Sequence, residues 1–367
     1  MRKSRVIAAG HICLDLTPKF TPGCEFGGLQ ALLRPGSLVR VDGCDVHTGG
    51  CVANTGLALK KMGLDVLLMG KAGTDAFGDM LSGLLDAEGA GGLIRDARSP
   101  TSYSVILAPP GVDRIFLHDP GANDTFSEKD IPDAALREAR LIHFGYPPLM
   151  RNMTVKDGAQ LKRLFERAHE NGCAVSLDMA AVDPAAEAGK ADWKMWLRNC
   201  MPQTDLFLPS FEEICFMLDR ERFESLCREG GDMTDRIDPE RDALPLAEQL
   251  VEMGAACAVI KCGTKGLVLV TGNRERMKKV PGDLTKGEEW VGRRITRSCL
   301  KAERVLSATG AGDSAIAAFL CAALEGRGPE DCLFFAAAQG ARCVTAWDAV
   351  SALLPIKDLE KEFSAQR

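Results

Sequence analysis

Residues 306–324 read LSATGAGDSAIAAFLCAAL, and the interpretation of the whole chain starts from them. The small residues of the TGAG run at 309–312 allow the backbone to turn tightly and to approach a ligand closely. Residues 314–324 are apolar nearly all round, which is typical of a buried helix. The free N–H groups at the start of such a helix, together with the positive end of its dipole, form an anion site.

Asp313 lies in the middle of this predicted anion site. A carboxylate where a phosphate could bind suits a base that accepts a proton from a hydroxyl group attacking phosphorus. The alternative is a tight turn in which the aspartate only caps the helix. The stretch by itself leaves both interpretations open.

The composition bounds the class of protein. A chain of 367 residues can bury a large core, as one large α/β domain or as two smaller ones. Charged residues make up 26% and hydrophobic residues 46%, which is ordinary for a soluble globular protein. The 45 Lys and Arg residues against 51 Asp and Glu give a net charge of −6, and no basic run occurs, so nucleic acid is not expected as a partner.

The cysteines and the N-terminus indicate the compartment. The 14 cysteines are scattered without a CxxC pair, so we expect buried, reduced thiols in a cytosolic protein. The apolar run at residues 6–9 is too short for a signal peptide, and His11 and Asp15 interrupt it. No apolar run approaches the ~20 residues that span a bilayer. The sequence therefore predicts a cytoplasmic protein without a membrane partner.

Alternating strand and helix patterns predict the architecture. Residues 5–10 (RVIAAG) form a short apolar run that ends in glycine, as buried strands do at the ligand edge of a sheet, and residues 11–15 are expected to continue it as far as Asp15. Such alternation predicts a mostly parallel sheet covered on both faces. From residue 139 onward, strands are expected at 141–144, 174–178, 206–208, 258–261 and 267–270, with helices that include 157–171 and 244–253.

The N-terminal third is more irregular. Prolines and glycines punctuate residues 17–46, where 38–42 alternate like a half-exposed strand, so we interpret this region as an insertion of strands. No linker separates two domains, and residues 1–367 are expected to form one. The elements expected elsewhere are a helix ending at Met62, a strand at 65–70, a helix at 76–88, a hairpin of 102–107 with 114–118, and surface loop or short strands at 272–301.

Taken in order, these features resemble the ribokinase-like (PfkB) family of sugar and nucleoside kinases. Residues 47–63 (HTGGCVANTGLALKKMG) are similar to its N-terminal signature, 70–78 (GKAGTDAFG) to the usual continuation, and 308–314 (ATGAGDS) to its C-terminal signature. Both signatures in this order favour the phosphate interpretation over a plain turn. The resemblance implies a three-layer α/β fold with helices on both faces of a mostly parallel sheet, and a small β-sheet lid inserted at about 17–48 and 101–118.

The resemblance also implies an ATP- and Mg²⁺-dependent kinase. Phosphoryl transfer depends on positioning and on charge stabilisation more than on covalent chemistry. Gly310, Ala311 and Gly312 would offer backbone N–H groups to the migrating phosphoryl oxygens as an anion hole. Asp313 would then be the general base.

On the acceptor side, Asp15, Gly49, Gly50 and Asn54 match family positions that hydrogen-bond sugar hydroxyls. Residues 119–123 (DPGAN), which include Asn123, resemble a segment near the pocket. The alternatives are a strand-end cap for Asp15, a first-turn helix residue for Asn54, and a simple turn at 119–123.

On the nucleotide side, residues 261–266 (KCGTKG) resemble the family's loop against the ATP phosphates, through Lys261, Gly263 and Gly266. Ser210 and Glu213 stand where the family carries Asn-x-x-Glu, and Glu213 is expected to act on Mg²⁺ through water. The alternatives are an ordinary hairpin for 261–266 and a helix-start acid for Glu213.

Three departures from the family pattern affect what else is expected. Ser307 and Ala308 replace the usual Asp-Thr, and Asp348 replaces a glycine, which argues against activation by a monovalent cation such as K⁺. Ala337 replaces an asparagine that is often near adenine, so no residue is assigned to the base.

The acceptor is expected to be a sugar or a sugar acid. A nucleoside is the first alternative, although the expected lid holds few aromatic residues for stacking on a base. A non-catalytic sugar sensor is the second. The lid would exclude water, with Tyr103 and Arg114 as candidate contacts, and would provide the contact of a homodimer.

Overall fold

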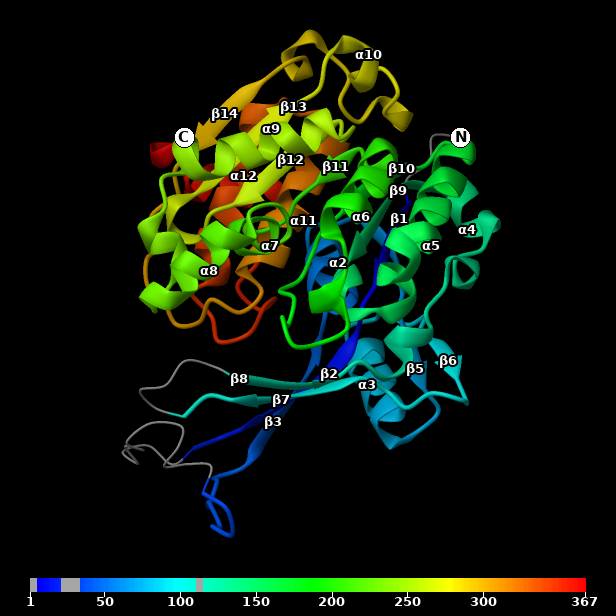
Figure 1. Ribbon diagram of the computed structural model, residues 1–367, viewed down its shortest axis with the longest axis vertical. Coiled ribbons are helices and arrows are strands. Elements are labelled where there is room, and N and C mark those ends of the chain that lie inside the picture. Colours follow the sequence, from blue (N-terminus) through cyan, green and yellow to red (C-terminus); the bar gives the residue numbers. More distant parts are fainter. Residues whose placement is uncertain (1–4, 21–33, 110–114) are drawn as a thin grey trace.

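A computed structural model describes residues 5–20, 34–109 and 115–367 of the chain. At its centre is an eight-stranded sheet that runs through the body of the molecule (Figure 1). The order across the sheet is β14 (Arg294–Arg297), β13 (Leu267–Thr271), β12 (Cys257–Lys261), β11 (Leu206–Phe207), β10 (Ala174–Leu177), β9 (Ala139–Gly145), β1 (Arg5–Gly10) and β4 (Asp65–Met69).

The central sheet is mostly parallel, as predicted. The six strands from β12 to β4 run parallel to their neighbours, and β13 and β14 add an antiparallel edge. Both faces of the central sheet are buried, and successive side chains of one strand therefore pack into two different hydrophobic cores. In β1, Ile7 and Ala9 belong to the core on one face, while Val6 belongs to the core on the other.

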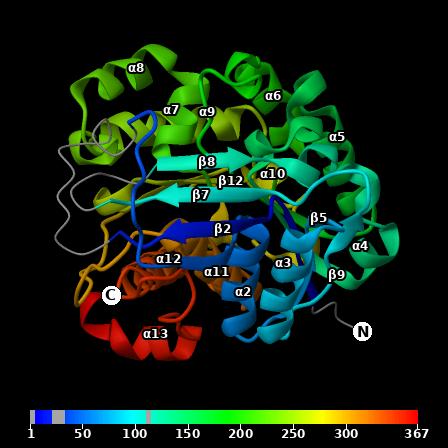
Figure 2. The same cartoon turned by 90° about the horizontal axis from the view of Figure 1, so that it is seen from below.

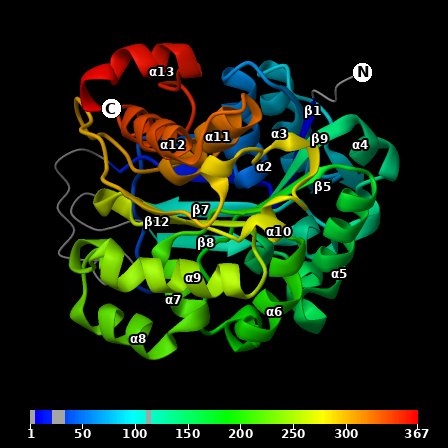
Figure 3. The same cartoon turned by 90° about the horizontal axis from the view of Figure 1, so that it is seen from above.

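Helices cover both faces of this sheet, and Figures 2 and 3 show the resulting three layers from below and from above. One layer consists of α2 (Cys51–Lys61), α11 (Ala311–Leu324), α12 (Pro329–Cys343) and α13 (Ile356–Glu362). The opposite layer consists of α4 (Asp133–Glu138), α5 (Arg151–Glu170), α6 (Trp193–Cys200), α7 (Phe211–Leu218), α8 (Arg220–Glu229) and α9 (Leu244–Glu252). Helix α11 is almost wholly buried because its residues are apolar on every side.

A second, four-stranded sheet lies apart from the central one, at the bottom of Figure 1. Its order is β3 (Cys44–Gly49), β2 (Cys13–Pro18), β7 (Tyr103–Leu107) and β8 (Ile115–Asp119). We call it the small sheet. Helix α3 (Ala76–Ala87) and the short strand pair β5 (Lys71–Gly73) and β6 (Ile94–Asp96) lie beside it at the same end of the molecule, while α10 (Arg274–Met277) lies at the other end.

The expected strands and helices from residue 139 onward are all present, with ends that differ by a few residues, apart from the start of α5. Helix α5 begins earlier than predicted, at Arg151, because a first helical turn precedes a kink at residues 155–158, where the backbone angles are not helical. The region 272–301 contains more than loop, since β14 completes the central sheet and Trp290 is buried.

Two predictions near the N-terminus were wrong. Residues 38–42 form no strand in the part of the chain that the structure describes, and Leu38 is 98% exposed. Residues 11–15 do not continue the first strand. The chain leaves the central sheet after Gly10, which has a φ of 120°, and β2 starts in the small sheet.

The described cysteines are all free thiols, as expected. Most of them are buried, but Cys44, Cys227 and Cys299 are exposed, contrary to the expectation of uniform burial. Across the described parts of the chain, no helix combines the length and the apolar character that crossing a bilayer requires.

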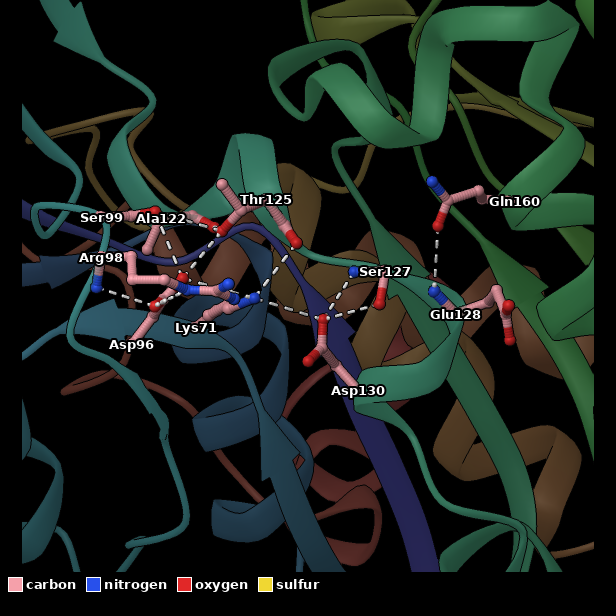
Figure 4. A network of polar contacts seen from close by, with 10 residues as sticks. All are labelled: Lys71, Asp96, Arg98, Ser99, Ala122, Thr125, Ser127, Glu128, Asp130 and Gln160. Atoms are coloured by element: carbon pink, nitrogen blue, oxygen red, sulfur yellow. Dashed lines mark hydrogen bonds and ion pairs between the residues drawn. The ribbon is translucent and has the colours of Figure 1, made fainter.

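A buried lysine joins the short strand pair to the segment that follows the small sheet (Figure 4). The Lys71 amine of β5 lies 3.6 Å from Asp96 Oδ2 of β6 and 3.5 Å from Asp130 Oδ2, and it donates to the Thr125 carbonyl at 3.1 Å. The Arg98 backbone N–H, and then Lys71, lower the pKa of Asp96 to about 2. Side chains of Lys71 and Asp96 are less than a tenth exposed, so neither charge can be left unpaired without cost.

Lys71→Met is therefore expected to lower the free energy of unfolding by about 3 kcal/mol, because two carboxylates lose their cation in a site with little water. Urea denaturation at pH 7 measures this change. Lys129→Met, at an exposed position next to Asp130, is the matched control and should change the free energy of unfolding by less than about 0.5 kcal/mol. Equal losses in the two variants would contradict the structural role of Lys71.

Candidate active site

The carboxylate of Asp313 lies in the first turn of α11 and is only 6% exposed. Three side chains donate to it. Asn54 Nδ2 lies 3.1 Å from Oδ2, and Thr55 Oγ1 lies 3.0 Å from Oδ1. The hydroxyl of Tyr146 lies 2.8 Å from each of the two oxygens. The donors come from α2 and from the turn after β9, so this carboxylate joins three parts of the chain that are distant in sequence.

Of the two glycines before Asp313, Gly310 is required by the local geometry. Gly310 has a φ of 74°, and a Cβ atom there would lie 2.2 Å from the Cβ of Ala349. The N–H of Ala311 donates to the Ala308 carbonyl at 3.3 Å, which closes the turn before the helix. A Cβ atom on Gly312 would lie 3.5 Å from Lys261 Cε, so the aliphatic part of that lysine passes beside the helix start. The predicted anion-hole residues thus lie beside a lysine.

Lys261 forms a buried ion pair with Asp178. Its amine lies 2.7 Å from Asp178 Oδ1 and also donates to the Leu208 carbonyl. Burial raises the pKa of Asp178, and Lys261 opposes that effect. Burial lowers the pKa of Lys261, but the carboxylates of Asp178, Glu213 and Asp313 together outweigh burial, so the pKa of Lys261 lies above its ordinary value. The lysine is therefore a positive charge held beside the start of α11.

Ser210 and Glu213 cap helix α7 reciprocally. Glu213 Oε2 accepts from the Ser210 N–H at 2.7 Å, and Ser210 Oγ accepts from the Glu213 N–H at 3.4 Å. Ser210 also forms an isolated parallel bridge with Lys261, which brings this cap to the same edge of the sheet. In the described part of the chain, no three or more His, Cys, Asp or Glu side chains form a group that could hold a metal ion. A Mg²⁺ contact of Glu213 through water stays a prediction.

Gly263 and Gly266 lie in the tight turn between β12 and β13. Their φ angles are 54° and 100°, and added Cβ atoms would lie 2.5 Å from Thr234 Oγ1 and 2.0 Å from the Arg297 carbonyl oxygen. The Cys262 N–H donates to the Gly266 carbonyl at 2.7 Å. These glycines are accounted for by the hairpin, and their contact with ATP stays a prediction.

The predicted acceptor residues meet where β1 leaves the body for the small sheet. A Cβ atom on Gly49 would lie 2.2 Å from Asp15 Oδ2, so the two residues are in direct contact. Gly50, with a φ of 83°, is the residue before α2, and a Cβ atom on it would lie 2.6 Å from His11 Nδ1. Burial raises the pKa of Asp15. Asp15 and Asp313 therefore lie at opposite ends of the segment 49–55, which contains Gly49, Gly50 and Asn54.

The register of the small sheet places a row of polar residues beside Asp15. Residues directly opposite one another on paired strands share a face of the sheet. Asp15 pairs with His47 on one side and with Ser104 on the other, and Ser104 pairs with His118. We call this set the polar row: His47, Asp15, Ser104 and His118.

Two histidines connect the polar row to the body. His11 Nε2 lies 3.2 Å from His118 Nε2, and His118 Nδ1 lies 3.0 Å from Ser104 Oγ. Burial lowers the pKa of His11, as does His118 to a lesser extent. Burial also lowers the pKa of His118. A hydrogen bond between two ring nitrogens needs one of them to be unprotonated, so this contact exists only when at least one ring is neutral.

Two predicted contacts are occupied by other partners. Asn123 is fully buried, and its amide group pairs with the backbone of Ile12, at 2.9 Å to the carbonyl and 3.1 Å from the N–H. It fixes the crossing between β1 and β2 and has no exposed surface to offer a sugar. Tyr103 packs edge-on against Phe77 of α3, on the face of the small sheet opposite the polar row. Arg114, the other candidate lid contact, lies outside the described residues.

The structure brings together most of the predicted site. Asp313, Asn54, Lys261 and Ser210 converge at one end of the central strands, and Asp15 with Gly49 and Gly50 continues the site into the small sheet. Sequence reasoning missed the partners of these residues, which are Thr55, Tyr146, Asp178, His11 and His118. A detectable signal was present for both Asp178 and Tyr146, because Asp178 ends the strand predicted at 174–178 and Tyr146 lies two residues after the strand predicted at 141–144.

The loop around Asp348 is built differently from a cation cage. Asp348 Oδ1 accepts from the N–H groups of Val350 and Ser351 at 2.9 and 2.7 Å. Ser307 Oγ accepts from the Thr309 N–H at 3.1 Å. Both side chains that depart from the family pattern are thus used in local turns, and K⁺ dependence stays untested.

Comparisons with known proteins agree with this geometry. Residues 24–356 match the model of the pfkB family of carbohydrate kinases. A relative in Archaeoglobus fulgidus, described as an uncharacterized sugar kinase, is 26% identical over 290 residues, which cover 79% of this chain and 95% of that protein.

Solved structures show the same fold. Arabidopsis thaliana ribokinase in complex with ribose and ATP superimposes with a TM-score of 0.71 at 19% identity, over 98% of each chain. A nucleoside kinase from Methanocaldococcus jannaschii superimposes with a TM-score of 0.66 at 19% identity, over 99% of each chain. The three-layer fold with a separate small sheet is therefore the ribokinase fold, which by itself does not distinguish a sugar from a nucleoside as acceptor.

The histidine contact predicts a pH dependence of stability. The lowered pKa values of His11 and His118 mean that the folded protein binds fewer protons than the unfolded chain below about pH 6.5. The free energy of unfolding should therefore fall as the pH drops below about 6.5, by up to about 1.4 kcal/mol per pH unit for each histidine that stays neutral.

His118→Gln should make this fall shallower between pH 6.5 and pH 5, because it removes one titrating ring and its effect on His11. Chemical denaturation at a series of pH values measures the difference between variant and wild type. His47→Gln, at an exposed position of the same sheet, controls for the removal of an imidazole. Identical pH profiles for wild type and His118→Gln would contradict the prediction.

Proposed function

Because the chain belongs to the pfkB family of carbohydrate kinases, phosphotransferases that use an alcohol group as acceptor, we propose that it transfers the γ-phosphoryl group of ATP to a hydroxyl of a sugar or sugar acid. The observation that carries this proposal is the buried carboxylate of Asp313 at the start of α11, with Asn54 of the acceptor segment bound directly to it. This contact puts a base, an anion-binding helix terminus and a hydroxyl-binding amide in one place.

Asp313 is the proposed general base. The acceptor oxygen attacks the γ-phosphorus, its O–P bond forms, and the bond from that phosphorus to the β–γ bridging oxygen breaks to release ADP. The proton of the acceptor hydroxyl passes to the Asp313 carboxylate. Such a base typically contributes ~10²–10⁴ in rate.

The second requirement is that the negative charge on the migrating phosphoryl group is stabilised. At the start of α11, the N–H groups of Gly310 and Gly312 would face the phosphoryl oxygens, whereas the Ala311 N–H already donates to the Ala308 carbonyl and would have to give up that bond. The Lys261 ammonium beside Gly312 supplies a positive charge, and phosphate oxygens would share it with Asp178.

Mg²⁺ fits this corner through its chemistry, because the carboxylates of Asp178 and Glu213 act electrostatically on each other and are the oxygen ligands that this ion prefers. These two residues would hold the ion directly or through water. When bound, Mg²⁺ would neutralise charge on the phosphate oxygens of ATP.

The acceptor would lie between the two aspartates. Asp15 and Asn54 suit vicinal hydroxyl groups, since a carboxylate accepts from them and an amide both donates and accepts. Gly49 and Gly50 leave room for the acceptor to reach the backbone. The small sheet would act as a lid, which keeps water from the γ-phosphoryl group. Exposed Phe116 and Leu117 on β8 make this sheet our candidate contact for a homodimer.

Asp313→Asn is expected to lower kcat by ~10²–10⁴, with little change in the affinity for an ATP analogue, because the amide keeps the shape but cannot take the proton. Coupled ADP release across a panel of neutral sugars, sugar acids and nucleosides measures the rate. Asp192→Asn, which retains a helix cap at the distant start of α6, is the matched control and should turn over normally.

The same panel decides between the alternatives. Turnover of nucleosides in preference to every sugar would favour a nucleoside kinase. Sugar binding, seen as a raised melting temperature, without any turnover would favour a sugar sensor. Near-normal turnover by Asp313→Asn would overturn the role of the base.

A further inference from the structure

Tyr146 donates a hydroxyl group to Asp313, which is the same chemical group that a sugar would donate. Its hydroxyl donates to both carboxylate oxygens, at 2.8 Å each. An acceptor alcohol that is about to lose its proton to Asp313 must donate to the same carboxylate. A phenol and an alcohol are both O–H donors of similar reach, so both would compete for one position.

Three donors already surround Asp313, and the Tyr146 hydroxyl oxygen lies at the same distance, 2.8 Å, from both carboxylate oxygens. Each oxygen of a carboxylate offers about two lone-pair sites. Oδ1 accepts from Thr55 and Tyr146, while Oδ2 accepts from Asn54 and Tyr146. The phenol has one proton to share between the two oxygens, but its oxygen takes the position from which an acceptor hydroxyl could reach either of them. An acceptor that uses this position has to displace Tyr146.

The three donors differ in how firmly they are held. Asn54 and Thr55 lie within α2, and Thr55 is fully buried. Tyr146 instead lies in the turn after β9, with left-handed backbone angles (φ 63°, ψ 40°) that are uncommon for a bulky residue. Such a conformation persists only when the surroundings support it, and it is found most often at ligand sites and switches. Tyr146 is therefore the donor that can give way.

The surroundings of Tyr146 connect it to the acceptor side. Its ring lies 6.0 Å from the ring of His11, centre to centre, at an interplanar angle of 33°. His11 is in turn in contact with Gly50 and with His118 of the polar row. A ligand that enters between Asp15 and Asp313 would meet Tyr146.

We propose that Tyr146 is a positioning residue whose hydroxyl occupies Asp313 in the absence of acceptor, keeps water off this carboxylate, and is displaced when the acceptor hydroxyl arrives. This role rests on the proposed kinase function. It explains how the site could hold ATP next to a base without hydrolysing it. In that hydrolysis, a water oxygen would attack the γ-phosphorus and release ADP and phosphate.

Tyr146→Phe tests the proposal, because it keeps the ring and removes only the hydroxyl. The KM for the best acceptor of the sugar panel should fall about fivefold, which is the value of one net hydrogen bond, while kcat should change little. ATP hydrolysis without acceptor should rise by a similar factor, since water gains access to Asp313. A merely structural tyrosine would produce neither this split between KM and kcat nor the gain in hydrolysis.

Tyr103→Phe is the matched control, because Tyr103 is the only other tyrosine in the chain and packs against Phe77 on the opposite face of the small sheet. It should leave KM, kcat and ATP hydrolysis as they are in the wild type. With tyrosine labelled by ¹³C at the ζ carbon, the two variants also assign the two NMR signals. The Tyr146 signal should move when the acceptor is added with a non-hydrolysable ATP analogue, and the Tyr103 signal should move less.

Several results would overturn the proposal. A raised acceptor KM in Tyr146→Phe would mean that the phenol binds the acceptor instead of yielding to it. Unchanged KM and ATP hydrolysis, or a Tyr146 signal that ignores the acceptor, would refute displacement while the kinase function stands. No turnover of any panel member would remove the kinase function and, with it, this role of Tyr146.

Discussion

One buried carboxylate, that of Asp313, is the constraint on which the rest of the site depends. Placing a charged group where it is only 6% exposed costs free energy unless hydrogen-bond donors replace the lost water. Asn54, Thr55 and Tyr146 supply these donors from positions far away in sequence. The same bonds therefore stabilise the charge and hold α2, α11 and the end of β9 together.

The central sheet explains why the other charged groups lie nearby. Parallel strands end at the same edge of a sheet, so residues that follow different strands become neighbours. His11 follows β1, Tyr146 follows β9, Asp178 follows β10, and Lys261 ends β12. A base and a buried ion pair thus share one edge, at the start of a helix whose dipole favours a negative ligand. The topology makes this edge the natural place for phosphate chemistry.

The small sheet is joined to the body by an apolar core, in which Leu14 packs with residues such as Leu57 and Leu68, and also by polar contacts. His11 contacts His118, Asn123 secures the backbone of Ile12, and Lys71 ties the neighbouring strand pair to Asp130. Such contacts depend on protonation and can exchange with a ligand more readily than close apolar packing.

The sequence by itself determined the class of fold, the strands and helices after residue 139, and the stretch around Asp313. These features are local: apolar runs, the glycines of a tight turn, and a helix that is apolar on every side carry their own signal. Local reasoning failed at residues 38–42, which form no strand among the described residues, and it did not anticipate that the amide of Asn123 pairs with the backbone of Ile12.

Only the tertiary structure decided which side chains face one another. The donors to Asp313, the pairing of Lys261 with Asp178 and the polar row depend on strand order and register, which bring together residues as far apart as 54 and 313. No local pattern encodes such contacts, because their energy comes from burial of charge between elements that meet only when the chain has folded.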